Sequence, residues 1–350
     1  MRRRDFLKTA ASIAALPAVG MRGRAFAAGT GPLDMKIGYH YWAPAGLIFE
    51  TLKNTNILDA MSVKAEFPIF STGGPLAEAA VGGSSDTMVG GDVTVLRGTS
   101  RRQGSKVVMR SNDWRWAVVA RTEFEGKTLS DLKGKKLGGS FVAGSFIGAL
   151  KTMESAGINP HGQVSLVNLD LPEAVAALQQ KIIDAAVIWD PALEKILSQG
   201  VGKVLYMSTP AQALGWQALT DRFLDRDGEE GAVRFCKAWI TASWWTSNNP
   251  DQPTQWFAKT SRLDPAVIKA TLSADRYLRS PVADINTLDF RLSDTDIKYA
   301  QMIIDFLYEQ KLATDRLEVA PLVQMSFMTE AMQEISSGDH MSLSDVNVKA

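Results

Sequence analysis

The segment Asp184-Ala185-Ala186-Val187-Ile188-Trp189-Asp190-Pro191 decides how this 350-residue chain is interpreted. Its five central residues, 185–189, are all apolar, which is typical of a strand that is buried on both faces of a sheet. Proline suits the start of a helix, and we expect that helix over 191–198. A buried strand that leads directly into a helix indicates an α/β fold with parallel strands.

The same alternation of strands and helices continues before and after this segment. We expect further strands over 135–139, 164–169 and 203–207, with helices over 145–156 and 172–181. An earlier run predicts strands over 35–39, 63–69 and 86–90, separated by helices over 44–58 and 75–81. From residue 223 onward, apolar residues recur mainly at helical spacing.

These runs predict two α/β lobes, each a mostly parallel sheet flanked by helices, with a cleft between the lobes. We expect residues 28–124 in the first lobe and 125–214 in the second. The mainly helical segment 215–340 is expected to return to the first lobe. Residues 341–350 show no clear pattern and predict a loose tail.

The first residues have the layout of an export signal. Arg3-Arg4-Asp5-Phe6-Leu7-Lys8 matches a twin-arginine (Tat) leader, and a mildly apolar stretch follows over 9–19. Ala25-Phe26-Ala27 is a small-x-small site of the kind that signal peptidases cut. We therefore expect a signal peptide over 1–27 and a mature protein in the periplasm. The alternative is an uncleaved anchor or a basic tail.

The composition excludes several classes of function. The leader holds six basic residues and one acidic residue, so its removal turns a net charge of 0 into −5, which does not suit nucleic acid. The lone cysteine, Cys236, cannot form an internal disulfide and is expected to be buried and inert. The three histidines, His40, His161 and His340, lie far apart, and no cluster has the spacing of metal ligands. We expect neither a metal nor a cofactor.

Candidate ligand-binding residues lie where strands end and helices begin. Ligands of open α/β sheets bind at the carboxyl ends of the strands, where helix N-termini offer free amide donors. The turns of this chain carry aromatic rings, hydroxyls and glycines, although ordinary packing is the alternative for each turn. The candidates are Tyr41, Trp42, Ser71, Thr72, Gly73, Gly74, Asp92, Ser140, Phe141, Ser145, Trp189 and Asp190.

The turns also restrict the ligand. They contain no arginine or lysine, and Arg110 and Arg115, nearby in sequence, are equally consistent with surface charges. Aromatic residues favour an organic ligand with an apolar or aromatic body over bare nitrate or bicarbonate. Trp114, Trp116 and Trp216 are candidates for further walls, although tryptophans also fill cores.

Over residues 34–335 the chain resembles solute-binding proteins of the nitrate/sulfonate/taurine class of ABC importers. The resemblance is carried by the turns 71–75 and 90–92, by Leu129-Ser130-Asp131-Leu132-Lys133-Gly134-Lys135-Lys136 and by the segment 184–191. It implies a type II-like periplasmic-binding-protein fold that binds a small sulfonate- or carboxylate-like anion and has no chemistry of its own. The implied partners are an ABC permease and its ATPase, with the Tat translocase during export; we expect a monomer.

Two alternatives stay open. The same fold resembles that of aryl-sulfinate desulfinases and thiamine-pyrimidine synthases, which would make the chain an enzyme. Those enzymes need a reactive cysteine or a histidine-rich site in the cleft, and here only His40 lies in a suitable turn, without a partner for acid–base work. The other alternative is a ligand-sensing partner of a sensor kinase, which keeps the same site and changes the recipient.

Overall fold

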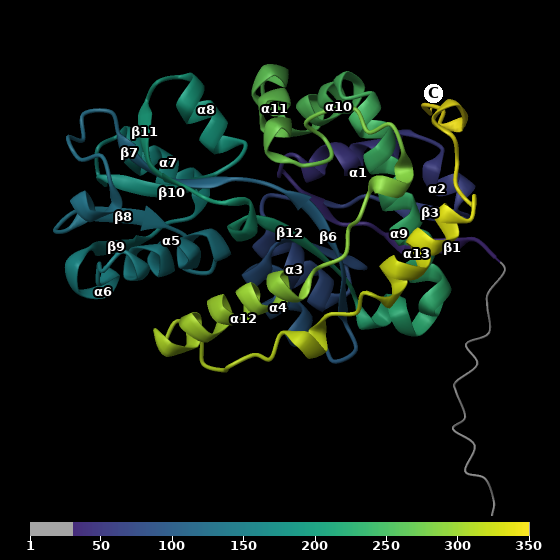
Figure 1. Cartoon of the computed structure of the whole chain (residues 1–350), viewed down its shortest axis with the longest axis horizontal. Coiled ribbons are helices and arrows are strands. Elements are labelled where there is room, and N and C mark those ends of the chain that lie inside the picture. Colours follow the sequence, from purple (N-terminus) through teal and green to yellow (C-terminus); the bar gives the residue numbers. More distant parts are fainter. Residues whose placement is uncertain (1–30, 350) are drawn as a thin grey trace, which may run out of the picture.

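Two groups of sheets, each covered by helices, lie side by side in the computed structural model (Figure 1), which describes residues 31–349. The predicted signal peptide over 1–27 lies outside the described residues. We call the part that begins with β1 the first lobe and the part that contains β8 the second lobe. The predicted two-lobed α/β fold is confirmed, but the sheets are mixed and not mostly parallel, because both lobes also contain antiparallel strand pairs.

The first lobe contains three small sheets. Two are parallel pairs, β1 (Leu33–Lys36) with β3 (Val63–Glu66) and β2 (Tyr39–His40) with β4 (Ile69–Phe70). In the third, β12 (Leu214–Leu219) runs antiparallel between β5 (Thr87–Gly91) and β6 (Lys106–Asp113). The register places Trp216 opposite Gly90 on β5 and opposite Arg110 on β6.

The second lobe has one five-stranded sheet in the order β11-β7-β10-β8-β9. Its strands are β7 (Trp116–Arg121), β8 (Lys136–Gly139), β9 (Ser165–Asn168), β10 (Ala185–Trp189) and β11 (Gly202–Met207). Strands β10, β8 and β9 are parallel, whereas β7 is antiparallel to both β10 and β11. The quoted apolar segment is therefore the central strand of this sheet, as its composition predicts.

Strand β6 was not predicted from the sequence because its polar residues have partners far away in the chain. Strand β6 ends in Arg110-Ser111-Asn112-Asp113, which would be unusual in a buried strand, yet all four residues are buried. The amide of Asp113 donates to Asp275, and the Arg110 guanidinium donates to the carbonyl of Asp289. Strand β7 follows directly, so the chain enters the second sheet at Trp116 and leaves it after β11.

Helices follow the strands of both lobes as the βα runs predict. The first lobe has α1 (Ala45–Asn54), α2 (Ile57–Ala60), α3 (Gly73–Gly82) and α4 (Asp92–Ser100). The second lobe has α5 (Gly144–Ser155), α6 (Pro160–Gln163), α7 (Leu171–Gln179) and α8 (Ala192–Ser198). A capping box between Asp170 and Glu173 fixes the start of α7.

The late helices touch both lobes. They are α9 (Asp221–Asn248), α10 (Asp251–Ser261), α11 (Pro265–Thr271), α12 (Asp294–Glu309) and α13 (Ser326–Ser336). Helix α9 packs on α1 and α13 in the first lobe. Helix α12 packs on both α4 and α5, and α11 packs on α8, so these two helices also contact the second lobe. The lobes are therefore joined by packing as well as by crossing strands.

The C-terminal residues are docked, unlike the loose tail that the sequence predicts. Val348 forms a β-bridge with Thr55, and the amide of Lys349 donates to the carbonyl of Asn54. Asn56 and Asn347 exchange hydrogen bonds beside this bridge. These partners lie almost 300 residues earlier, where no local pattern reveals them. Within residues 31–349, no helix combines the length and the apolar character that crossing a membrane requires.

Candidate ligand-binding site between the lobes

Three turns of the first lobe meet around His40, at the end of β2. A side-chain carbon added at Gly73, the first residue of α3, would lie 3.6 Å from His40 Nε2. One added at Gly90, near the end of β5, would lie 3.9 Å from the same atom. The predicted turns after β2, β4 and β5 are therefore brought together, and the glycines leave room beside the imidazole.

An aromatic wall continues from His40 to the crossing strands. His40 stacks on Trp42 with 5.3 Å between ring centroids, and Trp42 meets Trp114 edge to face at 5.4 Å. Trp114 lies over Gly91, where an added carbon would be 3.5 Å from the indole ring. Trp42 and Trp114 thus both lie beside His40 and Gly91 at this junction.

The other aromatic residues that the sequence offers as walls of the site lie in different surroundings. Trp116 and Trp216 are buried on the interior strands β7 and β12 of their sheets, whereas Trp42 and Trp114, which are also buried, lie beside the turns at His40 and Gly91. Tyr41, in contrast, has 40% of its surface exposed.

In the second lobe, the candidate turn leads from β8 into α5. Ser140 is buried, and Phe141 stacks on Phe146 with 4.9 Å between centroids. The amide of Phe141 donates to Asn168 Oδ1, which ties this turn to the end of β9. Ser145 lies in the first turn of α5 and is buried. The predicted residues of this turn therefore stand at one helix N-terminus.

The two lobes touch where α4 and α5 begin. A side chain at Gly144 would overlap Asp92 Oδ1, and it would lie 3.3 Å from Val93. The Asp92 carboxylate thus rests against the backbone of the second lobe, and only glycine fits opposite it. Gly144 lies inside the candidate turn 139–145, and what the sequence did not indicate is its close approach to Asp92 of the other lobe.

Burial disturbs the two titratable groups at this junction. Removal from water raises the pKa of Asp92 to about 6, although the hydrogen bond from the amide of Val93 (2.7 Å) acts in the opposite direction. Burial also lowers the pKa of His40 to about 4, against a smaller effect of the Val89 backbone. His40 is therefore neutral at physiological pH, while Asp92 is mostly ionised.

Three buried polar groups in these turns have no hydrogen-bond partner in the described residues. They are His40 Nε2, Trp114 Nε1 and Ser145 Oγ. Nearly all buried polar atoms in native proteins are paired, so an unpaired group at a turn is a candidate to bond with a ligand or a water molecule. The remaining side chains with such atoms, Arg110, Arg121, Gln217 and Thr241, lie outside the candidate turns.

Helix starts add backbone donors to the same junction. No side chain caps α3, whose N-cap is Thr72, or α5, whose N-cap is Ala143. Their first amides are therefore not satisfied by a capping side chain, and both helices are long enough to carry a dipole. Ser71 and Gly74 are exposed beside the start of α3. This arrangement suits an anionic group.

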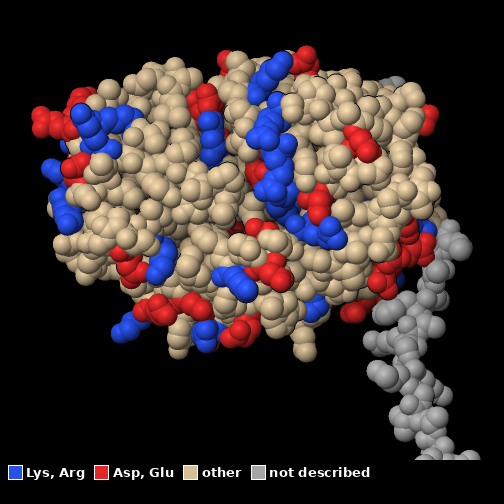
Figure 2. All heavy atoms as spheres, viewed as in Figure 1, with Lys and Arg blue, Asp and Glu red and all other residues tan. Residues whose placement is uncertain are grey.

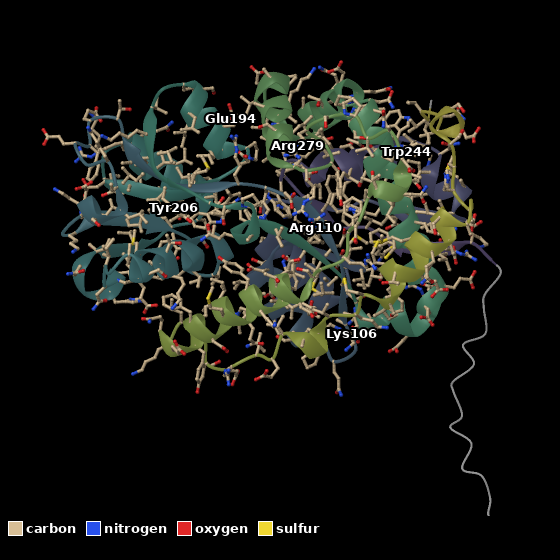
Figure 3. All side chains as sticks on the ribbon, viewed as in Figure 1. Lys106, Arg110, Glu194, Tyr206, Trp244 and Arg279 are labelled. Carbon is tan, nitrogen blue, oxygen red and sulfur yellow. The ribbon has the colours of Figure 1, made fainter. Side chains whose placement is uncertain are left out.

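The turn after β10 has a different role from the predicted one. Asp190 is fully buried, and its carboxylate accepts hydrogen bonds from Arg115 at 2.6 and 3.2 Å. Arg115 also pairs with Glu194, which is labelled on α8 in Figure 3. Both Arg115 and the buried Arg110 are thus paired, and neither is a solvated surface charge. Trp189 remains the partly exposed side chain at this turn.

The same junction offers little for catalysis or metal binding. Within residues 31–349, no group of three or more His, Cys, Asp or Glu side chains is placed to hold a metal ion. Cys236 lies in α9 and is buried, and burial raises the pKa of its thiol. A buried, protonated thiol is a poor nucleophile.

Two α/β lobes whose strand ends face each other define the periplasmic-binding-protein fold. Residues 108–217, which run from β6 to β12, match the family described as NMT1/THI5 like. The alkanesulfonate-binding protein SsuA from Xanthomonas axonopodis pv. citri has a similar structure, with a TM-score of 0.69 and 22% identity. That match covers 85% of this chain and 100% of SsuA.

Relatives that are similar in sequence are also described as binding proteins. The "Putative aliphatic sulfonates-binding protein" of Bacillus subtilis (strain 168) is 24% identical over 280 residues, which are 79% of this chain and 81% of the relative. The taurine-binding periplasmic protein of Escherichia coli (strain K12) is 38% identical over 98 residues, 27% of this chain and 29% of the relative. The predicted resemblance to solute-binding proteins of the nitrate/sulfonate/taurine class is confirmed.

A fold shared with an enzyme does not alter this conclusion. The desulfurization enzyme DSZB is also similar in structure, with a TM-score of 0.59 and 14% identity over 87% of this chain and 99% of that protein. Identity at this level shows the fold alone. The sequence relatives described above are binding proteins, which favours binding over catalysis.

Proposed function

We propose that this chain is the solute-binding component of an ABC importer and binds a small organic anion between its two lobes. One observation carries the proposal: unpaired buried groups at the strand ends come from both lobes, His40 and Trp114 on one side and Ser145 on the other. A ligand that bonds to both sides would hold the lobes together, as domain closure about a hinge requires.

The chemistry of the junction favours an anion with an organic body. The helix starts at Gly73 and Gly144 supply amide donors, and Ser145 supplies a hydroxyl. Trp42 and Trp114 supply an apolar wall. A sulfonate or carboxylate with a short carbon chain uses both kinds of surface, whereas nitrate uses only the donors.

The charge on the surface fits this class of ligand. On the face shown in Figure 2, acidic and basic residues are mixed, and a band of Lys and Arg runs over the middle of the molecule. Positive charge of this kind attracts anions and does not form the broad basic surface that nucleic acid requires.

The route and partners of the protein follow from its class. We propose that Arg3-Arg4 directs export through the Tat translocase, that cleavage after Ala27 releases a periplasmic monomer, and that a membrane permease with its ATPase receives the ligand. Relatives of this chain are periplasmic, which supports the compartment. Replacement of both arginines by lysine, Arg3→Lys with Arg4→Lys, would keep the protein in the cytoplasm if the leader is of the twin-arginine type.

The binding function is tested by tryptophan fluorescence titration of the mature protein with alkanesulfonates, short carboxylates and nitrate. We expect saturable binding of organic anions and loss of affinity of about tenfold in Ser145→Ala, because a hydrogen bond to a charged ligand is lost. Ser155→Ala, at the exposed end of the same helix, is the matched control and should bind normally. Tight binding of nitrate without any response to organic anions would contradict the proposal.

A further inference from the structure

Helix α12 packs on both helices that meet at the junction of the lobes. It contacts α4, which begins at Asp92, and α5, whose first turn holds Ser145. It also contacts η2 (Pro210–Gln212), a short 3-10 helix between β11 and β12. We call residues 208–213, by which the chain leaves the second lobe, the return segment. One late helix therefore bridges the two lobes beside the return segment.

The hydroxyl of Tyr299 on α12 lies at the centre of these contacts. A side-chain carbon added at Gly148 on α5 would be 3.6 Å from this hydroxyl. Burial raises the pKa of Tyr299. The neighbouring Asp92 and Tyr206 raise it further, whereas a hydrogen bond with the side chain of Gln212 acts in the opposite direction. Groups from the first lobe, the second lobe and the return segment thus meet at one hydroxyl.

Gln212 connects this hydroxyl to the sheet of the second lobe. Its Oε1 accepts hydrogen bonds from the hydroxyl of Tyr206 on β11 at 2.6 Å and from the amide of Thr209 at 2.8 Å. Its Nε2 donates to Thr152 Oγ1 on α5 at 3.3 Å. Its backbone carbonyl accepts the indole N–H of Trp116, the first residue of β7, at 3.0 Å. The return segment is therefore fixed to β7, β11 and α5, and Tyr206 is labelled in Figure 3.

We propose that Tyr299 is a positioning residue, which holds the two lobes in the arrangement that assembles the ligand site by joining α12 to α5 and to Gln212. This inference rests on the proposed function and goes beyond it, because Tyr299 acts on the lobes and not on the ligand. Without the hydroxyl, the lobes separate in a larger fraction of unliganded molecules. The apparent affinity then falls in proportion to the lost competent fraction, by the same factor for every ligand.

The separation of the lobes is measured without ligand in Tyr299→Phe, which removes the hydroxyl and keeps the ring. Spin labels at Lys64→Cys in the first lobe and Gln179→Cys in the second occupy exposed positions, and the native Cys236 is buried. Double electron–electron resonance should give a longer mean distance in Tyr299→Phe than in the labelled wild-type protein. Tyr308→Phe, an exposed tyrosine on the same helix, is the matched control and should keep the wild-type distance.

Affinity is measured by isothermal titration calorimetry with ethanesulfonate, butanesulfonate and propionate. We expect Tyr299→Phe to weaken the binding of each probe by about fivefold, which is the typical effect of one lost hydrogen bond. Tyr308→Phe should bind each probe as the wild-type protein does. A loss that differs between the probes would show that Tyr299 contacts the ligand, and it would overturn the positioning role.

The two measurements distinguish this inference from the proposed function. If the label distance in Tyr299→Phe equals that of the wild-type protein, the inference is wrong, while anion binding stands. If the probes do not bind the wild-type protein, the proposed function fails, and the distances still test Tyr299.

A second variant covers the case in which Tyr299→Phe does not fold, as judged by circular dichroism. Tyr206→Phe removes the hydrogen bond to Gln212 from the side of β11 and should also lengthen the label distance. An unchanged distance in Tyr206→Phe would contradict the role assigned to this connection.

Discussion

Arg115 and Asp190 form a two-point ion pair at the place where the chain enters the second lobe. Arg115 Nε donates to Asp190 Oδ2 at 2.6 Å and Nη2 donates to Oδ1 at 3.2 Å. Asp190 Oδ1 also accepts the amide of Glu194 in α8. One arginine before β7 thereby fixes the end of β10 and the start of α8, which holds Trp189 beside the junction.

Arg115→Met should destabilise the protein by about 3 kcal/mol, because it leaves the fully buried Asp190 carboxylate without its partner. The double variant Arg115→Met with Asp190→Leu should lose less than the sum of the single changes. Urea unfolding measures both. Lys181→Met, which breaks the exposed pair with Glu123, is the control and should cost less than about 1 kcal/mol. If Arg115→Met and Lys181→Met lose the same amount of unfolding free energy, the role assigned to the Arg115–Asp190 pair is contradicted.

Gly144→Ala should weaken the contact between the lobes, because the added methyl group overlaps the Asp92 carboxylate. We expect a loss of about 1–3 kcal/mol of stability together with reduced ligand affinity. Gly82→Ala, in α3 with open space around it, should be neutral or slightly stabilising. Thermal unfolding and titration are the measurements. Combining Gly144→Ala with Asp92→Ala should restore part of the stability. If the stability is not restored, the methyl group of Gly144→Ala does not act through the Asp92 carboxylate.

Trp114→Phe should reduce ligand affinity with little loss of stability, because Trp114 Nε1 has no partner within the protein. Trp244, labelled in Figure 3, gives the matched comparison, since its Nε1 donates to the carbonyl of Val282 at 2.9 Å. Trp244→Phe should lower stability by about 1 kcal/mol and leave affinity unchanged. If Trp114→Phe instead lowers the stability and binds the ligand with unchanged affinity, Trp114 does not contact the ligand.

Asp275 should make the protein more stable as the pH falls from 7.5 towards 5. Burial and the neighbouring Asp113 raise the pKa of Asp275 to about 6, so the folded state binds its proton more tightly than the unfolded state does. At a pH above the pKa of folded Asp275, the ionised carboxylate therefore lowers the stability by its full amount. At a pH below the pKa that Asp275 has in the unfolded chain, this loss of stability disappears. Arg276 and Arg110, which pair with Asp113, face the same cluster.

The comparison with Asp275→Asn isolates this effect. The wild-type protein should gain stability relative to Asp275→Asn between pH 7.5 and 5, measured by urea unfolding at each pH. Carboxylates with lowered pKa values, such as Asp221, lose their contribution only at lower pH, outside this window. A constant difference between the two proteins across the window would show that Asp275 does not titrate there.

The sequence predicts those parts of the fold in which local pattern and tertiary role agree. The apolar run 185–189 is the central strand because every residue in it suits burial. Strand β6 was missed because Arg110 and Asp113 become acceptable in a buried strand only through Asp289, Asp275 and Arg276. Such partners lie more than 150 residues away, and pattern reasoning does not reach them.

The candidate site shows the same division. From the turns that contain glycines and hydroxyl side chains, we predicted helix starts that lie near a ligand. In the structure, Gly73 lies beside His40, and Ser145 follows Gly144 at the start of α5. Asp190 was predicted as a ligand contact, whereas its two oxygens are occupied by Arg115 and α8. An aspartate that bonds to a helix start and an aspartate that binds a ligand have the same local sequence. Only the hydrogen-bond partners in the folded structure distinguish the two roles.

A crystal structure of the mature protein with a bound organic anion tests the central claim most directly. The account predicts electron density for one ligand that contacts His40 or Trp114 in the first lobe and Ser145 in the second lobe at the same time. Density confined to one lobe, or a ligand bound away from the starts of α3 and α5, would contradict it.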